Sequence, residues 1–347
     1  MSETRERGRI QRGREIANAL YLSWRTPPPP VELSSGDISR LISHLVQGAA
    51  GPLLWRRLRD TQRLSTSDAA QLRDASRYQI LETASAEHAV AAAFARLRAA
   101  GLHPILGKGF AIARLYPERG LRHAGDIDLY ICGNEYPTAR SEADGLGRER
   151  FMPIDLHRGF GELDDRPAEE LLRRAVSAPL ADAEVTMFGP EDHLRLICLH
   201  GLKHGLARPT WLCDIAVALE ARPASFDWDW FLEGDARRAD WIVCAMGLAH
   251  ELLGARVDDT PLAERAFRLP RWLAPAVLAS WAIAYRTPQS IGLMLRRPAP
   301  FLSELAMRWP NAVEATVELG AAFDEQPRLP YQLKMFLGRS ARFAFQR

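Results

Sequence analysis

Lysine is almost absent from this 347-residue chain, because only three of its 45 basic residues are lysines: Lys108, Lys203 and Lys334. Arginine does not replace lysine at positions where a compact, strongly hydrated ammonium is required. A lysine that persists in so arginine-rich a chain is therefore a candidate for a chemical role. Lys108 lies between two glycines and Lys203 lies between two histidines, so both belong to motifs that can carry chemistry.

Other scarcities restrict the class of protein further. The four cysteines are far apart and form no CxxC pair, which is typical of small buried residues in a reducing compartment and not of a disulfide framework or a zinc knuckle. No run approaches 18 apolar residues, and the arginine-rich start lacks the apolar stretch of a signal peptide. We therefore expect a cytoplasmic protein without a membrane partner. A net charge of +2 is too small to indicate a nucleic-acid partner.

Composition and periodicity divide the chain into four segments. Residues 1–30 are expected to form a flexible tail, frayed up to about residue 15, and a stiff proline linker. Residues 31–100 show amphipathic helical spacing. Residues 101–165 mix short apolar strands with helices, and residues 166–347 are expected to be almost entirely helical.

A pair of aspartates in the segment DIDLYIC is the first candidate site. Asp126 and Asp128 are two residues apart on a predicted strand, so their side chains leave the same face with Cα atoms roughly 6–7 Å apart. Ile127, Leu129 and Ile131 then point the other way, into the core. Two carboxylates together with substrate phosphates are a ligand set that suits Mg²⁺. The alternative is a pair of acidic residues at a strand edge that binds no metal.

The neighbourhood of this pair favours the metal site. Gly107, Lys108 and Gly109 form a turn between a predicted strand and a predicted helix, where backbone amides and the lysine ammonium can face phosphate oxygens. Asp155, in the later predicted strand FMPIDLH, can supply a third carboxylate. His157 is two residues further on and should share the face of Asp155.

At these residues the chain resembles a known family. The segment LGKGFAIARLYPERGLRHAGDIDLYI, the later IDLHRG and the helix-rich HLRLICLHGLKHGLARPTWLCDIAVAL are similar to the motifs of the uncharacterised nucleotidyltransferase family, within the polymerase-β-like nucleotidyltransferase superfamily. The resemblance covers about residues 70 to 220. It implies an α+β fold, in which a small mixed sheet is flanked by N-terminal helices and a mostly helical C-terminal lobe. It also implies transfer of a nucleotidyl group from a nucleoside triphosphate, with Mg²⁺ or Mn²⁺.

Position by position, the resemblance implies roles for the motif residues. Gly107, Lys108 and Gly109 take the place of the phosphate-facing turn of the superfamily, although lysine-glycine replaces its usual glycine-serine. Asp126 and Asp128 match its paired metal ligands. The third carboxylate, which would also help to deprotonate the acceptor hydroxyl, matches less clearly, because the stretch before it holds one clear strand where relatives often show a hairpin. Asp155 is the candidate, and the nearby substitutes are Glu162, Asp164 and Asp165.

Basic residues outside the strands are secondary candidates for binding the nucleotide. Arg122 precedes Asp126 by four residues and can pair with a phosphate or bridge to a carboxylate. Lys203 and His204 lie on a predicted helix that can cover the sheet and offer either side chain to the nucleotide. The alternatives are buried, hydrogen-bonded histidines or a zinc site, but HGLKH lacks the glutamate of HExxH.

The sequence thus predicts an enzyme that binds a nucleoside triphosphate with Mg²⁺ or Mn²⁺ and moves the nucleoside monophosphate to an acceptor, releasing pyrophosphate. Which triphosphate and which acceptor (a small molecule, a peptide, a protein or RNA) stay open, as does the oligomeric state. Two other functions also stay open: a nucleotide-binding scaffold of a biosynthetic pathway with little turnover, and a nucleotidyltransferase toxin that acts on RNA.

Overall fold

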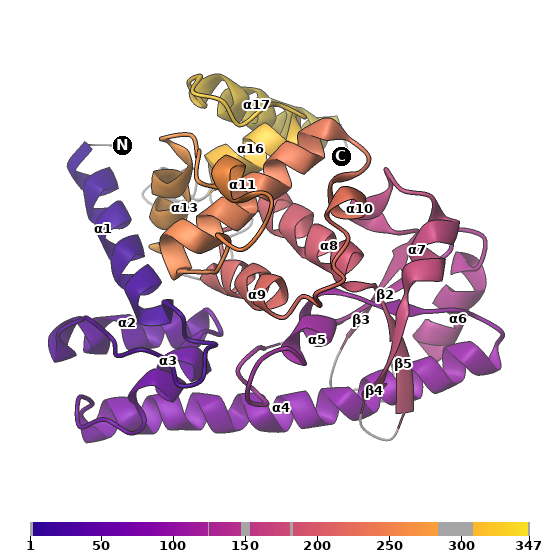
Figure 1. Ribbon diagram of the computed structural model, residues 1–347, viewed down its shortest axis with the longest axis horizontal. Helices are drawn as coiled ribbons and strands as arrows, with labels where there is room; N and C mark the ends of the chain where they lie inside the picture. Colours follow the sequence, from indigo (N-terminus) through magenta and orange to yellow (C-terminus); the bar gives the residue numbers. More distant parts are fainter. Residues whose placement is uncertain (1–2, 124, 147–152, 181–182, 284–307, 346–347) are drawn as a thin grey trace.

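The computed structural model describes residues 3–123, 125–146, 153–180, 183–283 and 308–345. A small mixed β-sheet lies in the right-hand half of the molecule as viewed in Figure 1. Its five strands lie in the order β3-β2-β1-β5-β4. β1 is antiparallel to β2 and parallel to β5, β2 is parallel to β3, and β4 is antiparallel to β5. The strand bounds are β1 Ile105–Leu106, β2 Ile127–Ile131, β3 Ile154–Arg158, β4 Val176–Leu180 and β5 Ala183–Met187. The predicted α+β class is confirmed.

β2 separates an apolar face from a polar one, as its alternating sequence predicts. Ile127, Leu129 and Ile131 are fully buried in a core that they share with Phe94 and Leu97 of helix α4 (Thr66–Ala99). Asp128 and Tyr130 leave the opposite face, since successive side chains of a strand alternate. Helix α6 (Tyr136–Leu146) connects β2 to the parallel strand β3 and packs against both β3 and α4.

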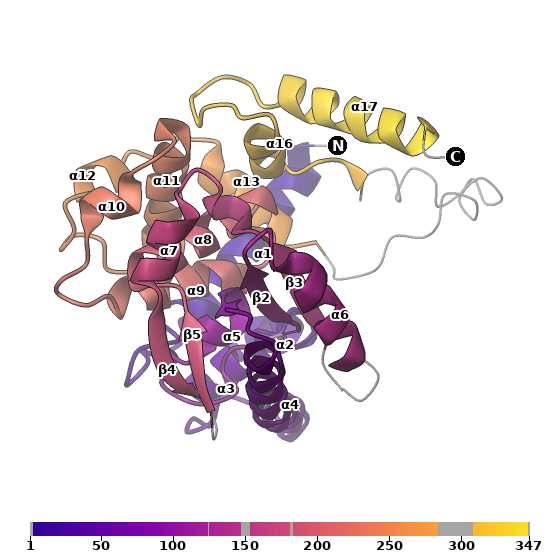
Figure 2. The same cartoon turned by 90° about the vertical axis from the view of Figure 1, so that its right-hand side faces the viewer.

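Helix α4 joins the sheet to the N-terminal helices. It runs along one side of the molecule in Figure 1 and is seen nearly end-on in Figure 2. Near its start it packs against α2 (Ser35–Gln47) and α3 (Gly51–Leu58), and further along it packs against α6 and β5. Leu72 accordingly belongs to the larger helical core, whereas Val90 belongs to the core beneath the sheet.

The N-terminal segment differs from its prediction. Residues expected to fray form helix α1 (Glu3–Leu20), whose later part is buried against α13 (Leu273–Trp281). Gly13 allows the close approach, because a Cβ there would lie 2.2 Å from the carbonyl oxygen of Leu278. The sequence gave little sign of the first part of this helix, because Ile10 is its one large apolar residue before the last two turns, where Ile16 and Leu20 are buried.

The chain after residue 167 is also less uniform than predicted. Residues 176–180 and 183–187 form the antiparallel strands β4 and β5, so the prediction that nearly all of this part is helical is wrong there. β4 is an edge strand with Pro179 in it and little burial, so its pattern gave no strong signal. The remaining elements are η1 Gly161–Leu163, α5 Lys108–Ala113, α7 Ala168–Arg174, α8 Pro190–Lys203, α9 Pro209–Glu220, α10 Trp228–Leu232, α11 Ala236–Leu253, α12 Ala263–Ala266, α16 Ala312–Glu318 and α17 Leu329–Phe345. Within the described ranges, no helix combines the length and the apolar character needed to cross a membrane.

Candidate active site

The predicted glycine-lysine-glycine turn lies between β1 and α5, next to β2. The backbone N–H of Gly107 donates to the carbonyl oxygen of Asp128, which fixes the turn in register with that strand. A side chain at Gly107 would not fit, because its Cβ would lie 2.7 Å from the Tyr130 ring. Lys108 has a φ of +48°, in the left-handed region that costs a non-glycine residue roughly 1–2 kcal/mol. The imidazole of His193 on α8 is buried near this backbone, and the main chain of Lys108 acts to raise the pKa of His193 against the larger effect of burial.

The carboxylates of Asp128 and Asp155 meet on the polar face of the sheet, together with His157 and the Lys108 ammonium. Lys108 Nζ lies 2.8 Å from Asp128 Oδ1 and 3.1 Å from His157 Nε2. His157 Nε2 lies 3.0 Å from Asp128 Oδ1 and 3.2 Å from Asp155 Oδ2. The His157 ring stacks on Tyr130, with ring centroids 4.4 Å apart and planes at 15°, so its orientation is fixed. Asp155 is therefore beside Asp128, as predicted.

This donor set fits a divalent cation. Asp128, Asp155 and His157 each offer one ligand atom, and these atoms all lie within 4.8 Å of one another. Carboxylate oxygens are the preferred ligands of Mg²⁺ and Mn²⁺, and an imidazole nitrogen is acceptable to Mn²⁺. Asp126, which the sequence predicted as a ligand, lies immediately before β2 and lines the same cavity, but its carboxylate is not part of this group of ligand atoms. These residues could thus hold a divalent metal ion.

Electrostatics distinguish the two aspartates of the pair. Burial raises the pKa of Asp126, and the nearby charges of Asp128 and Asp155 raise it further against a smaller effect of Lys108. Burial also acts to raise the pKa of Asp128, but the hydrogen bond from His157 and the charge of Lys108 outweigh it and lower that pKa. Asp128 is accordingly held as an anion, whereas Asp126 gains most from an additional positive charge.

A cavity of about 530 Å³ opens in front of these carboxylates. Helix α8 and its C-terminal cap form the facing wall, because Ile197, His200 and His204 recur at helical spacing on the side that lines the cavity. Trp211 of α9 and Arg208 complete that wall. The ring centroids of His204 and Trp211 are 5.7 Å apart.

The wall presents an aromatic surface in which the His204 imidazole is neutral at pH 7. Burial lowers the pKa of His204 to about 4, and the neighbouring His200 and Lys203 lower it further. The guanidinium of Arg208 lies 5.6 Å from the Trp211 ring centroid, at the distance of a cation–π contact. Of the nucleotide-binding residues predicted on this helix, His204 lines the cavity and Lys203 does not. Trp211 and Arg208 were missed because the path that brings α9 to the cavity is not visible in local periodicity.

Arg122 and Lys203 are engaged with carboxylates. Arg122 lines the cavity, and its Nε lies 2.7 and 2.8 Å from the two carboxylate oxygens of Asp214, which also accepts a hydrogen bond from Tyr116. The structure thus places Arg122 in the carboxylate bridge that the sequence allowed as its alternative role. Lys203 Nζ lies 3.2 Å from Glu162 Oε1, and it does not line this cavity.

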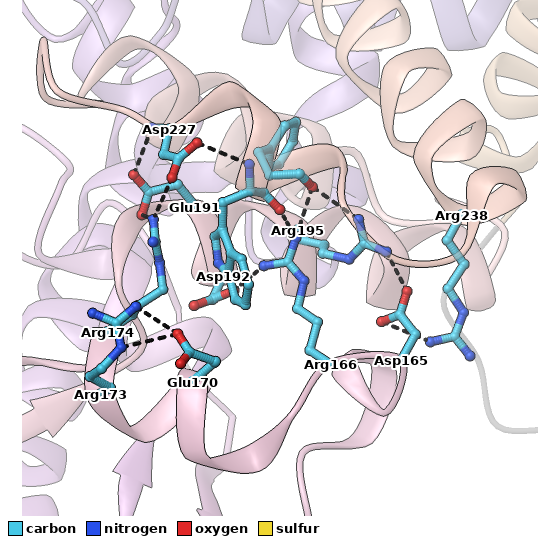
Figure 3. A network of polar contacts seen from close by, with 12 residues as sticks. Asp165, Arg166, Glu170, Arg173, Arg174, Glu191, Asp192, Arg195, Asp227 and Arg238 are labelled. Carbon is cyan, nitrogen blue, oxygen red and sulfur yellow. Dashed lines mark hydrogen bonds and ion pairs between the residues drawn. The ribbon is translucent and has the colours of Figure 1, made fainter.

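The sequence left Glu162, Asp164 and Asp165 as substitutes for the third carboxylate, and all three are occupied elsewhere. Glu162 pairs with Lys203, and Asp164 pairs with Arg238 at 2.5 Å. Asp165 belongs to a network of ion pairs in which Arg195 Nη2 lies 2.5 Å from its Oδ2 (Figure 3). Asp155 is the candidate that reaches Asp128.

The network in Figure 3 holds helix α8 in place. Arg166 forms a fully buried ion pair with Asp192 of α8, and Arg195 donates a 2.9 Å hydrogen bond to the carbonyl oxygen of Phe231. These contacts connect α8 to the segment after β3 and to α10. Since α8 also carries His193 and the cavity wall, the network positions both.

Three features together define a nucleotidyltransferase core. They are the small mixed sheet, the aspartate pair with a third carboxylate beside it, and the glycine-bounded turn. The chain belongs to the uncharacterised nucleotidyltransferase family, whose sequence model matches residues 34–254. No curated protein and no solved structure matches the chain.

Proposed function

We propose that the protein is a metal-dependent nucleotidyltransferase that transfers a nucleoside monophosphate from a nucleoside triphosphate to an acceptor. The observation that carries this proposal is the placement of Asp128 beside Asp155, with Asp126 and Lys108, at one cavity. A bound Mg²⁺ or Mn²⁺ supplies neutralisation of the phosphate charge and acidification of the attacking hydroxyl.

The chain's own residues would bind and orient the reactants. The backbone N–H groups of Lys108 and Gly109, at the start of α5, and the Lys108 ammonium would face the triphosphate. The aromatic wall, which includes His204 and Trp211, lies across the cavity and offers a stacking surface to the base. Catalysis would then rest on positioning and on electrostatic stabilisation.

The reaction would be a single displacement at the α-phosphorus. An acceptor oxygen forms a bond to that phosphorus, while the bond from the phosphorus to the oxygen that bridges to the β-phosphate breaks. Pyrophosphate leaves with the bonding electron pair. The acceptor proton passes to a carboxylate, for which Asp155 is suited because its side chain is 54% exposed at the cavity and can be reached by an acceptor.

The test is release of pyrophosphate from each of the four common nucleoside triphosphates, with Mn²⁺ and a cell extract as the source of acceptors. The double variant Asp126→Asn plus Asp128→Asn should abolish metal-dependent release and retain the fold by circular dichroism. Asp74→Asn plus Asp258→Asn, at exposed positions outside the cavity, is the matched control. Unchanged turnover in the first double variant would refute the proposal. Tight nucleotide binding without any release would instead indicate the scaffold role.

A further inference from the structure

The Lys108 ammonium lies against the same carboxylate that would bind a metal ion, and the fold holds it there. Its side chain is 11% exposed, and its Nζ contacts both Asp128 and His157. The main chain that precedes it is fixed, because the Gly107 N–H donates to the carbonyl oxygen of Asp128. Nζ also lies 5.6 Å from the Tyr130 ring centroid. The ammonium is thus a built-in part of the carboxylate cluster.

The contacts of Asp128 limit the number of its carboxylate oxygens that are available to metal ions. Both Lys108 Nζ and His157 Nε2 lie within 3.0 Å of the same oxygen, Oδ1, so Oδ2 is the oxygen of Asp128 that neither group contacts. In a two-ion site the cations lie about 3.5–4 Å apart, and a carboxylate that bridges them uses one oxygen for each. Asp128 cannot act as that bridge while Lys108 remains on Oδ1.

The net charge of the side chains around the cavity also favours one divalent ion over two. Asp126, Asp128 and Asp155 carry three negative charges when ionised, and Lys108 carries one positive charge. Arg122 and Asp214, which also line the cavity, pair with each other. Arg208 also lines the cavity and adds a second positive charge, so the unpaired side chains of the lining carry one net negative charge. In the absence of a nucleotide, a second divalent ion would therefore leave a large excess of positive charge at the carboxylates, next to a buried ammonium.

We infer that the site takes one divalent cation per chain, and that the Lys108 ammonium stands where a second metal ion would otherwise bind. This inference rests on the proposed function, since it specifies the metal stoichiometry of that same site. The lysine would neutralise phosphate charge as a permanent monovalent cation. This role would also explain why position 108 is a lysine in a chain whose basic residues are nearly all arginines.

The test is a count of bound Mn²⁺ in the full-length protein, by calorimetric titration and by electron paramagnetic resonance, with Mn²⁺ alone and with the α,β-methylene analogues of ATP and GTP. Wild type should bind one ion with the hyperfine pattern of an isolated Mn²⁺. Lys108→Met, which keeps the bulk and removes the charge, should bind two ions with an exchange-coupled spectrum. Lys334→Met, at an exposed position on α17, is the matched control and should bind one.

The wild-type count alone decides the inference, even if Lys108→Met fails to fold. A coupled pair of ions in wild type would overturn the inference and leave the proposed function standing. One ion in both wild type and a folded Lys108→Met would also overturn the role of the lysine. Absence of Mn²⁺ binding together with absence of pyrophosphate release would overturn both proposals.

Discussion

Asp128 and Asp155 are register partners on the adjacent parallel strands β2 and β3, and the next pair on the same face is Tyr130 with His157. Because paired residues of neighbouring strands point to the same side of a sheet, this register brings the second and third carboxylates together. The stacked pair behind them fixes the imidazole that contacts both. A shift of β3 by one residue would turn Asp155 to the other face.

Asp155 should matter for turnover, and the nearby Asp164 should not. Asp155→Asn removes a carboxylate at the metal-binding face, so we expect kcat to fall roughly 100-fold or more and Mn²⁺ affinity to fall with it. Asp164→Asn makes the same chemical change nine positions later, where the carboxylate pairs with Arg238 outside the cavity lining. Pyrophosphate release and Mn²⁺ titration measure both effects. Equal losses in the two variants would show that Asp155 has no special role.

Trp211 should contribute to nucleotide affinity without affecting the metal. Base–aromatic stacking contributes about 1–3 kcal/mol, so Trp211→Ala should weaken binding of a nucleotide analogue by roughly 10-fold or more. Binding of Mn²⁺ alone should stay as in wild type, because Trp211 lies on the opposite wall from the carboxylates. Trp309→Ala, at a residue 37% exposed and outside the lining, is the control. If Trp211→Ala binds the nucleotide analogue as tightly as wild type does, the base does not stack on Trp211.

His193 should make folding stability depend on pH in the acidic range. Burial lowers its pKa to about 4 from 6.5, so the unfolded chain binds a proton between these values that the folded protein excludes. The contribution is therefore fully present above pH 6.5 and is lost progressively as the pH falls toward 4. It amounts to about 3 kcal/mol at most, because one pKa unit corresponds to 1.36 kcal/mol.

Urea unfolding at pH 7 and at pH 4.5 measures this contribution. His193→Gln keeps an N–H donor and removes the titration, so its stability should differ less between the two pH values than that of wild type. His88→Gln, at an exposed position on α4, controls for the loss of an imidazole. If His193→Gln and wild type lose the same stability on acidification, His193 does not stay neutral in the folded protein.

Local patterns in the sequence were sufficient for the strands of the site and for its turn. Period-two alternation placed Asp128 and Ile127 on opposite faces of β2, because strand geometry depends only on the chain's own residues, whereas Asp126 lies just before that strand. The glycines around Lys108 marked the turn for the same reason. The family motifs covered this same region, and the sequence model of the family matches it.

Tertiary structure alone decided which distant side chains meet. The sequence offered four acidic residues for the third carboxylate, and the parallel pairing of β2 with β3 through α6 selected Asp155. Ion pairing engaged Arg122 and Lys203 with carboxylates distant in sequence, and it placed the Lys108 ammonium on Asp128. The physical reason is that strand register and ion pairing depend on groups that only the folded chain brings within a few ångströms, so no local periodicity encodes them.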